Sequence, residues 1–264
     1  MFRTISSWLA RLSRRPRGSA GWRRLRLDGR ATVYAVGDVH GCLTLLRDLE
    51  AAIVADAHGR PGPKLIVMLG DTIDRGPESA QVLDHLCGRP PRGFRRVCLG
   101  GNHEAAMLDF IENRLPLGAW LAMGGMQTLY SYGIDPAYLA TLHKTEGAIE
   151  RAVRQAIPDA HKRFLRELRL MAASEHYVLV HAGLRPGVPL EKQSAEDCTT
   201  IRMERIADDP DRLRWLIHGH SPVEHPTLVG RRLNIDTGAF KTGRLTAVRL
   251  SGTRAKLIFA RQLR

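Results

Sequence analysis

A chain of 264 residues, 44% of them hydrophobic, is long enough to form one large domain with a substantial core. Its four cysteines include no Cys-x-x-Cys pair, which argues against a disulfide framework and a thiolate zinc site and favours a reducing cytosol. No apolar run approaches the ~20 residues of a membrane span, and the net charge of +13 is concentrated near the N-terminus.

Residues 1–30 form the most basic segment, with nine arginines against one aspartate, which is +8 of the net +13. We expect a flexible basic tail that precedes a cytoplasmic domain. A short amphipathic helix in it could lie on an anionic membrane surface; nucleic-acid binding and organelle targeting are less favoured alternatives. Apolar residues recur at helical spacing among the arginines of this tail: Phe2, Ile5, Trp8, Leu9 and Leu12.

Three β-loop-α units follow the tail in direct succession. Strand patterns at Thr32–Val36, Leu65–Leu69 and Phe94–Leu99 each end in a glycine-containing loop. Helix patterns at Leu43–Ala55 and Glu78–Leu86 separate these strands. Right-handed crossovers then place the three loops at one edge of a largely parallel sheet, where α/β proteins bind ligands.

The second half of the chain changes from helical to strand patterns. Residues 104–173 read as helical, and we expect an insertion that walls or covers the site. Strands dominate again from Tyr177 onwards and end with Leu245–Leu250 and Ala255–Ala260. These late strands predict a second, more antiparallel sheet packed on the first, within one domain that spans residues 31–264.

Carboxylate, imidazole and amide side chains, each near a glycine, follow five of the predicted strands: Asp38 and His40, Asp71 and Asp74, Asn102 and His103, His181, and His220. One aspartate-rich turn can be explained as a helix cap. Five such strand ends in one chain favour a metal site with oxygen and nitrogen ligands, and the glycines allow close approach of backbone and substrate.

Three motifs resemble those of a known family: Gly-Asp-x-His-Gly at Gly37–Gly41, Gly-Asp-x-x-Asp-Arg-Gly at Gly70–Gly76 and Gly-Asn-His-Glu at Gly101–Glu104. With the later His-Ala-Gly at His181 and Gly-His at His220, they resemble the phosphoprotein phosphatase branch of the calcineurin-like metallophosphoesterases, especially the bacterial serine/threonine phosphatases. The resemblance covers nearly the whole chain outside the tail. It implies an α/β fold of two packed mixed β-sheets flanked by helices.

The resemblance also implies two divalent metal ions, with manganese favoured and iron or zinc as alternatives. Two dications ~3.5–4 Å apart need an anion between them, and a carboxylate at a tight strand end suits this bridging role. The implied ligands are Asp38, His40 and Asp71 for the first ion, and the bridging Asp71 with Asn102, His181 and His220 for the second.

The implied reaction is in-line attack on phosphorus by a hydroxide formed from water at the metal ions. His103 would protonate the leaving group as general acid. Asp74 would orient the His103 imidazole and raise its pKa.

Arg75, Arg202 and Asn102 would bind the phosphate oxygens, the two arginines through bidentate contacts. Arg202 is the weaker match, because Thr200 stands where the family segment carries tryptophan; Arg205 is the alternative.

Two further residues have weaker roles. Asp236 resembles a residue of the family segment that lines the floor of the site, and His218 shares the face of His220 on an extended segment.

Phosphorylated proteins are the leading substrate class, with serine and threonine phosphates first and phosphotyrosine as an alternative. Symmetrical hydrolases of dinucleoside polyphosphates such as diadenosine tetraphosphate share these motifs but tend to lose the aspartate before Arg-Gly-Pro, which Asp74 retains here. That activity is the main alternative. A non-enzymatic basic adaptor for nucleic acid or anionic membrane is disfavoured, because no ligand or acid is missing from the series.

Overall fold

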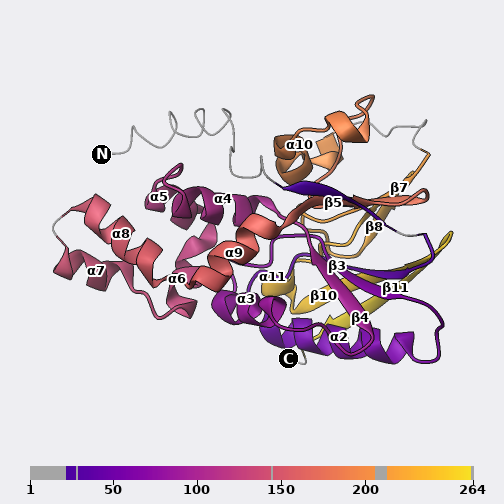
Figure 1. Cartoon of the computed structure of the whole chain (residues 1–264), viewed down its shortest axis with the longest axis horizontal. Coiled ribbons are helices and arrows are strands. Elements are labelled where there is room, and N and C mark those ends of the chain that lie inside the picture. Colours follow the sequence, from indigo (N-terminus) through magenta and orange to yellow (C-terminus); the bar gives the residue numbers. More distant parts are fainter. Residues whose placement is uncertain (1–21, 28, 144, 206–212, 263–264) are drawn as a thin grey trace.

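The computed structural model describes residues 22–27, 29–143, 145–205 and 213–262. Two mixed β-sheets pack face to face, and helices cover their outer faces (Figure 1). Four free cysteines are present. Within the described ranges, no helix combines the length and apolar character needed to cross a bilayer.

The first sheet has the strand order β11-β10-β2-β3-β4. Its parallel part is β2 (Thr32–Val36), β3 (Lys64–Met68) and β4 (Phe94–Cys98), as the three β-loop-α units predict. The last strands, β10 (Arg244–Ser251) and β11 (Arg254–Arg261), were expected in a second sheet, but they extend this one. The reason is that β10 pairs antiparallel with the free edge of β2, which the crossovers leave open.

The second sheet has the strand order β1-β5-β6-β7-β9-β8. It is mixed: β5–β6 and β8–β9 are antiparallel pairs, whereas β1–β5, β6–β7 and β7–β9 are parallel. The strands are β1 (Arg23–Arg26), β5 (Arg169–Ala173), β6 (Tyr177–Val180), β7 (Trp215–His218), β8 (Thr227–Val229) and β9 (Arg232–Asn234).

Helices α4 to α9 occupy most of the predicted insertion, residues 104–173, and extend to one side of the sheets (Figure 1). The last five residues of that stretch form β5 instead, because Leu170, Met171 and Ala172 are needed in the core. The helical segments are α2 (Leu43–Ala57), α3 (Ser79–Cys87), α4 (Asn102–Ile111), α5 (Leu117–Trp120), η2 (Leu121–Gly125), α6 (Met126–Ser131), α7 (Pro136–Leu142), α8 (Glu146–Ala156), α9 (Asp159–Glu167), η3 (Leu190–Lys192), α10 (Ala195–Thr200), η4 (Met203–Arg205) and α11 (Ala239–Thr242).

Alternation along β2 shows how the layers are held together. Tyr34 and Val36 belong to the core cluster that packs under α2. Val33 and Ala35 belong to the cluster between the two sheets. Because successive side chains of a strand point to opposite faces, one short segment contributes to both layers of the core, and β2 is buried throughout.

Strand β1 lies within the segment that was expected to be a tail. Residues 1–30 were expected to form a flexible tail, but Arg23–Arg26 form β1 at the edge of the second sheet. Trp22 is 5% exposed, and its indole N–H donates to the carbonyl oxygen of Leu165 at 2.9 Å. The strand escaped prediction because its sequence, Arg-Arg-Leu-Arg, has no alternating apolar pattern. The predicted amphipathic helix between Phe2 and Leu12 lies outside the described residues.

Replacing Trp22 with alanine should lower the free energy of unfolding by about 3–5 kcal/mol, the usual cost of removing a large buried aromatic side chain. The ring packs against Gly100, where a Cβ atom would collide with it. Urea unfolding followed by circular dichroism measures the change. Trp215→Ala, at a position 37% exposed, is the matched control and should cost much less. Equal costs for the two variants would contradict a structural role for the segment at Trp22.

Candidate metal centre

The carboxylate of Asp71 lies where loops from both sheets converge. Its Oδ2 is 3.3 Å from Nε2 of His181, 3.7 Å from Nε2 of His40 and 3.8 Å from Nε2 of His103. Asp71 follows β3, whereas His181 follows β6 of the other sheet. All four residues are at most 2% exposed. Burial opposes ionisation of Asp71, but the neighbouring histidines hold its pKa well below the ordinary value.

A second group of side chains adjoins Asp71 on the His181 side. Oδ1 of Asn102 lies 3.1 Å from Nε2 of His181 and 2.9 Å from Nδ1 of His220. The two imidazole nitrogens are themselves 3.2 Å apart. Ligand atoms of Asp71, His181 and His220 all lie within 4.8 Å of one another, so they could hold one cation together.

Asp38 is the remaining predicted ligand, and it lies against His220. Its Oδ2 accepts the main-chain N–H of His220 at 3.1 Å, whereas its Oδ1 is buried and has no hydrogen-bond partner. Gly219 makes this approach feasible, since a Cβ there would collide with Oδ1 of Asp38. Burial, followed by the charges of Asp236 and Asp71, raises the pKa of Asp38 well above its ordinary value. A bound cation would compensate these crowded carboxylates.

Asp236 contributes a second partnerless carboxylate oxygen to this part of the site. Its Oδ1 accepts the N–H of Gly238 at 2.9 Å, but its buried Oδ2 has no partner. Burial raises the pKa of Asp236 to about 6.

Two histidines have the orientation of metal ligands. Nδ1 of His40 lies 2.8 Å from the carbonyl oxygen of Ile73, and Nδ1 of His181 lies 3.1 Å from that of Leu69. Because a carbonyl oxygen only accepts, each Nδ1 carries a proton, and in the neutral imidazole Nε2 keeps its lone pair. Such second contacts typically orient metal-binding histidines. Both Nε2 atoms lie near Asp71.

The protonation of these two histidines differs. Burial lowers the pKa of His40 to about 3, so His40 is neutral. Burial acts the same way on His181, but the charge of Asp71, a hydrogen bond to it and the charge of Glu104 together outweigh burial and raise the pKa. A cation at this position would compete with that proton. The oxygen and nitrogen donors, together with the partnerless oxygens of Asp38 and Asp236, fit a site for divalent metal.

His103 forms a dyad with Asp74. Its Nδ1 is 2.7 Å from Oδ2 of Asp74, and both residues are buried. Burial lowers the pKa of His103, but Asp71 and then Asp74 raise it above the ordinary value. Ligand atoms of His40, Asp71 and His103 also lie within 4.8 Å of one another. Nε2 of His103 faces Oδ2 of Asp71 at 3.8 Å, while its Nδ1 is engaged by Asp74.

Two residues of the helical insertion hold Asp74, and the sequence analysis missed both. The indole N–H of Trp120 donates to Oδ2 of Asp74 at 3.1 Å, and the hydroxyl of Thr128 donates to Oδ1 at 2.6 Å. The main-chain N–H of Asp74 is shared between the hydroxyl oxygens of Thr128 and Ser79, at 3.0 and 2.9 Å. The sequence analysis assigned neither residue a role.

Glu104 connects two of the loops through hydrogen bonds. Its position in the Gly-Asn-His-Glu motif did not indicate this role. Its Oε2 accepts the N–H groups of Asp71 and Gly101, both at 2.9 Å. Its Oε1 accepts the N–H and the hydroxyl of Thr72, at 2.6 and 2.8 Å. The buried carboxylate therefore fixes the backbone on which Asp71 stands, relative to the start of α4.

Arg75 lies beside the centre, as the sequence predicts. Its Nη1 is 3.2 Å from Nε2 of His40, and its guanidinium carbon is 5.2 Å from the ring centroid of Phe240. The main-chain N–H of Arg75 donates to the carbonyl oxygen of Gly124 at 3.1 Å. Gly124 has φ +107°, and a Cβ there would approach Cγ of Arg75 to 2.9 Å. A glycine at this position of the insertion thus leaves room for Arg75.

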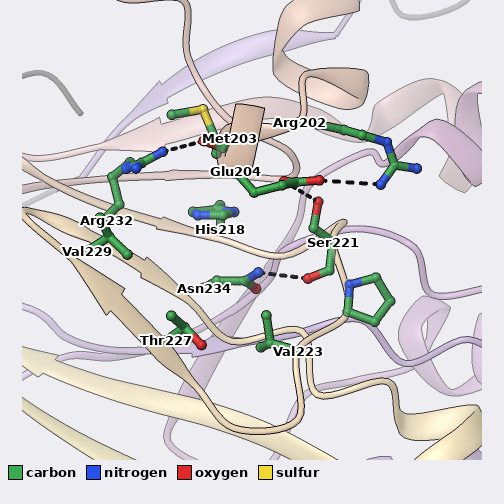
Figure 2. Close-up of a pocket in the computed structure, with 11 residues that line it drawn as sticks. Arg202, Met203, Glu204, His218, Ser221, Val223, Thr227, Val229, Arg232 and Asn234 are labelled. Carbon is green, nitrogen blue, oxygen red and sulfur yellow. Dashed lines mark hydrogen bonds and ion pairs between the residues drawn. The ribbon is translucent and has the colours of Figure 1, made fainter. Parts of the chain in front are cut away.

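Arg202 lies at the rim of a separate pocket of ≈ 250 Å³, shown in Figure 2. Its Nη1 is 3.6 Å from Oε1 of Glu204, and its side chain is 48% exposed. Glu204 in turn accepts the hydroxyl of Ser221 at 2.9 Å. Burial, followed by the charge of His181, lowers the pKa of His220 to about 3. His218 lines this pocket and not the group around Asp71.

His220→Ala should weaken Mn²⁺ binding by more than about 10–100-fold. That range is typical for removal of a residue that only hydrogen-bonds to a ligand, whereas His220 is itself a predicted ligand. Isothermal titration calorimetry of the metal-free protein with Mn²⁺ measures the affinity. His218→Ala is a matched control two residues away, and its affinity should stay near that of the wild type. Equal weakening by both variants would show a general disturbance of this strand end and would contradict the ligand role of His220.

Comparison with known proteins is consistent with this geometry. The model of the calcineurin-like phosphoesterase family matches residues 31–224. A bis(5'-nucleosyl)-tetraphosphatase PrpE [asymmetrical] of Geobacillus thermodenitrificans is 26% identical over 246 residues. A protein of the same name from Bacillus anthracis is 27% identical over 233 residues. Each match covers 81% of this chain and 88% of the relative.

Solved structures agree on the fold. A protein provisionally named a diadenosine tetraphosphatase superposes with a TM-score of 0.63 at 19% identity, covering 90% of this chain and 98% of that one. A cold-active protein tyrosine phosphatase gives a TM-score of 0.51 at 15% identity, covering 90% of this chain and 81% of that one. Since the family model matches most of the chain, including every predicted metal ligand, the chain belongs to the calcineurin-like phosphoesterase family.

Proposed function

We propose that this protein hydrolyses dinucleoside tetraphosphates with the help of two divalent metal ions, manganese being the first candidate. The observation that carries the proposal is the convergence of ligand-type side chains from both sheets on the buried carboxylate of Asp71. The substrate class is supported by the names of the relatives, which match 81% of the chain.

This substrate class replaces phosphorylated proteins as the leading one. The preference for phosphorylated proteins depended on one residue, Asp74. Hydrolysis of dinucleotides is also compatible with an aspartate at this position. The contacts of Asp74 with His103 and Trp120 serve any phosphoester whose leaving oxygen takes up a proton.

Divalent ions at this centre would lower the pKa of water and neutralise charge on the phosphate oxygens. The chain would supply the remaining functions. Arg75, whose Nη1 is 3.2 Å from Nε2 of His40, would bind phosphate oxygens. His103 would donate the proton from Nε2, since its Nδ1 is engaged by Asp74. With asymmetrical cleavage, a P–O bond forms to water, one anhydride P–O bond breaks, and the products are a nucleoside triphosphate and a nucleoside monophosphate.

Purified protein with Mn²⁺ should convert diadenosine tetraphosphate to ATP and AMP, and chelation followed by Mn²⁺ addition should remove and restore this activity. Asp71→Asn should lower kcat by more than about 100-fold, since charge stabilisation by even one group is worth that much. Chromatography of the products measures both effects. Asp159→Asn, on the exposed surface of α9, is the control and should retain activity.

Three other outcomes have distinct meanings. Two ADP molecules as products would contradict asymmetrical cleavage and retain the substrate class. Turnover of a phosphoserine peptide without turnover of the dinucleotide would contradict the proposed substrate. Full activity of Asp71→Asn would contradict the metal centre.

Activity should fall on the alkaline side as pH rises through the pKa of His103, because a general acid must be protonated. Asp74→Asn removes one of the two carboxylates that raise this pKa, so the alkaline limb of the kcat profile should move to lower pH. The maximal kcat should also fall, within the about 10²–10⁴-fold that general acid catalysis contributes. Glu112→Gln, remote from the dyad, is the control. An unchanged alkaline limb in Asp74→Asn would show that another group limits the reaction.

A further inference from the structure

A pocket of ≈ 460 Å³ lies beside the loop that follows Arg75. It lies between the start of α2, the loop after Arg75, the short helix α11 and the C-terminal end of the described chain. Its volume falls within the range of about 300–1,000 Å³ typical of small-molecule sites, whereas the pocket at Arg202 is smaller. The lining residues used below are Thr44, Pro77, Glu78, Phe240, Lys241 and Gln262.

Phe240 connects this pocket to the candidate centre. Its ring is 38% exposed, and it meets the His40 imidazole edge-on with centroids 5.3 Å apart. The Arg75 guanidinium carbon lies 5.2 Å from the same ring. A phosphate bound by Arg75 would therefore have the aromatic wall of the pocket directly beside it.

The chemistry of the pocket suits a nucleobase better than a phosphate. An exposed aromatic ring offers a stacking surface, and planar bases of any sequence use such surfaces. The carboxylate of Glu78 would repel a phosphate inside the pocket but could accept an amino group of a base. Thr44 and Gln262 add hydroxyl and amide groups to the lining, and Lys241 adds a positive charge that favours phosphates nearby.

We infer that this pocket binds the base of the nucleotide whose phosphate reaches Arg75, with Phe240 as its stacking surface. The inference rests on the proposed function, in that it assigns the nucleoside end of the same substrate. With this role, Phe240 makes the protein bind nucleotides in preference to phosphoesters that lack a base.

The experiment compares AMP with ribose 5-phosphate, which has the same phosphate and sugar but no base. Calorimetric titration of the Mn²⁺-loaded wild type should show AMP binding tighter by about 5- to 150-fold, the range that base stacking on an aromatic side chain gives. Phe240→Ala should remove this preference, and Phe240→Tyr should keep it. Phe259→Ala is the matched control, because Phe259 is 39% exposed and also lies near an arginine, at 6.0 Å from Arg261.

Equal binding of AMP and ribose 5-phosphate by the wild type would overturn the inference. Weakening of both ligands to the same degree in Phe240→Ala would also overturn it, because Phe240 would then only support His40 and Arg75. Assaying diadenosine tetraphosphate with the same preparations separates the two proposals. A base preference that depends on Phe240, without cleavage of the dinucleotide, supports the base pocket and contradicts the proposed function. Cleavage of the dinucleotide without a base preference supports the proposed function and contradicts the base pocket.

Discussion

The rest of the centre depends on the interaction between the buried negative charge of Asp71 and the groups that compensate it. A carboxylate removed from water is costly unless charges or hydrogen bonds compensate it. Here the compensation comes from His103 and His181, which stand on different loops. These loops can meet only because the two sheets pack face to face with their strand ends together. Glu104 then fixes the backbone at Asp71, so the charge and its surroundings form one rigid unit.

The backbone of the site is strained, and the strain is concentrated at residues with assigned roles. Left-handed φ angles in residues other than glycine or asparagine cost of order 1–3 kcal/mol and persist where the surrounding structure enforces them. Across the described ranges, six non-glycine residues have positive φ, and all but Asn113 belong to the centre. The packed strands on either side therefore stabilise conformations that the local sequence does not favour. The five are His40, Asp71, Asp74, Arg75 and His220.

Sequence patterns could predict that the candidate ligands converge, because each one lies within a few residues of a strand end, and strand ends in a parallel sheet share an edge. The same logic could not reach Trp120 and Thr128, because they are 46 and 54 residues from Asp74 and lie in helices, away from any strand end. Strand β1 carries one apolar residue, so no periodicity marks it. The substrate class was also beyond the motifs, since enzymes for phosphoproteins and for dinucleotides share the residues expected to bind metal and phosphate.

The helical insertion has two parts, one that contacts Asp74 and its neighbours and one that does not. The two parts should tolerate amino-acid substitution to different degrees. The inner part, which includes Trp120, Gly124 and Thr128, shapes the dyad and the Arg75 loop, so most substitutions there should be selected against. The outer helix α7 has no buried residue, and α8 has one, Val153. Sequence drift, length changes and new surface properties should therefore accumulate in the outer helices, while the inner segment retains its identity among related proteins.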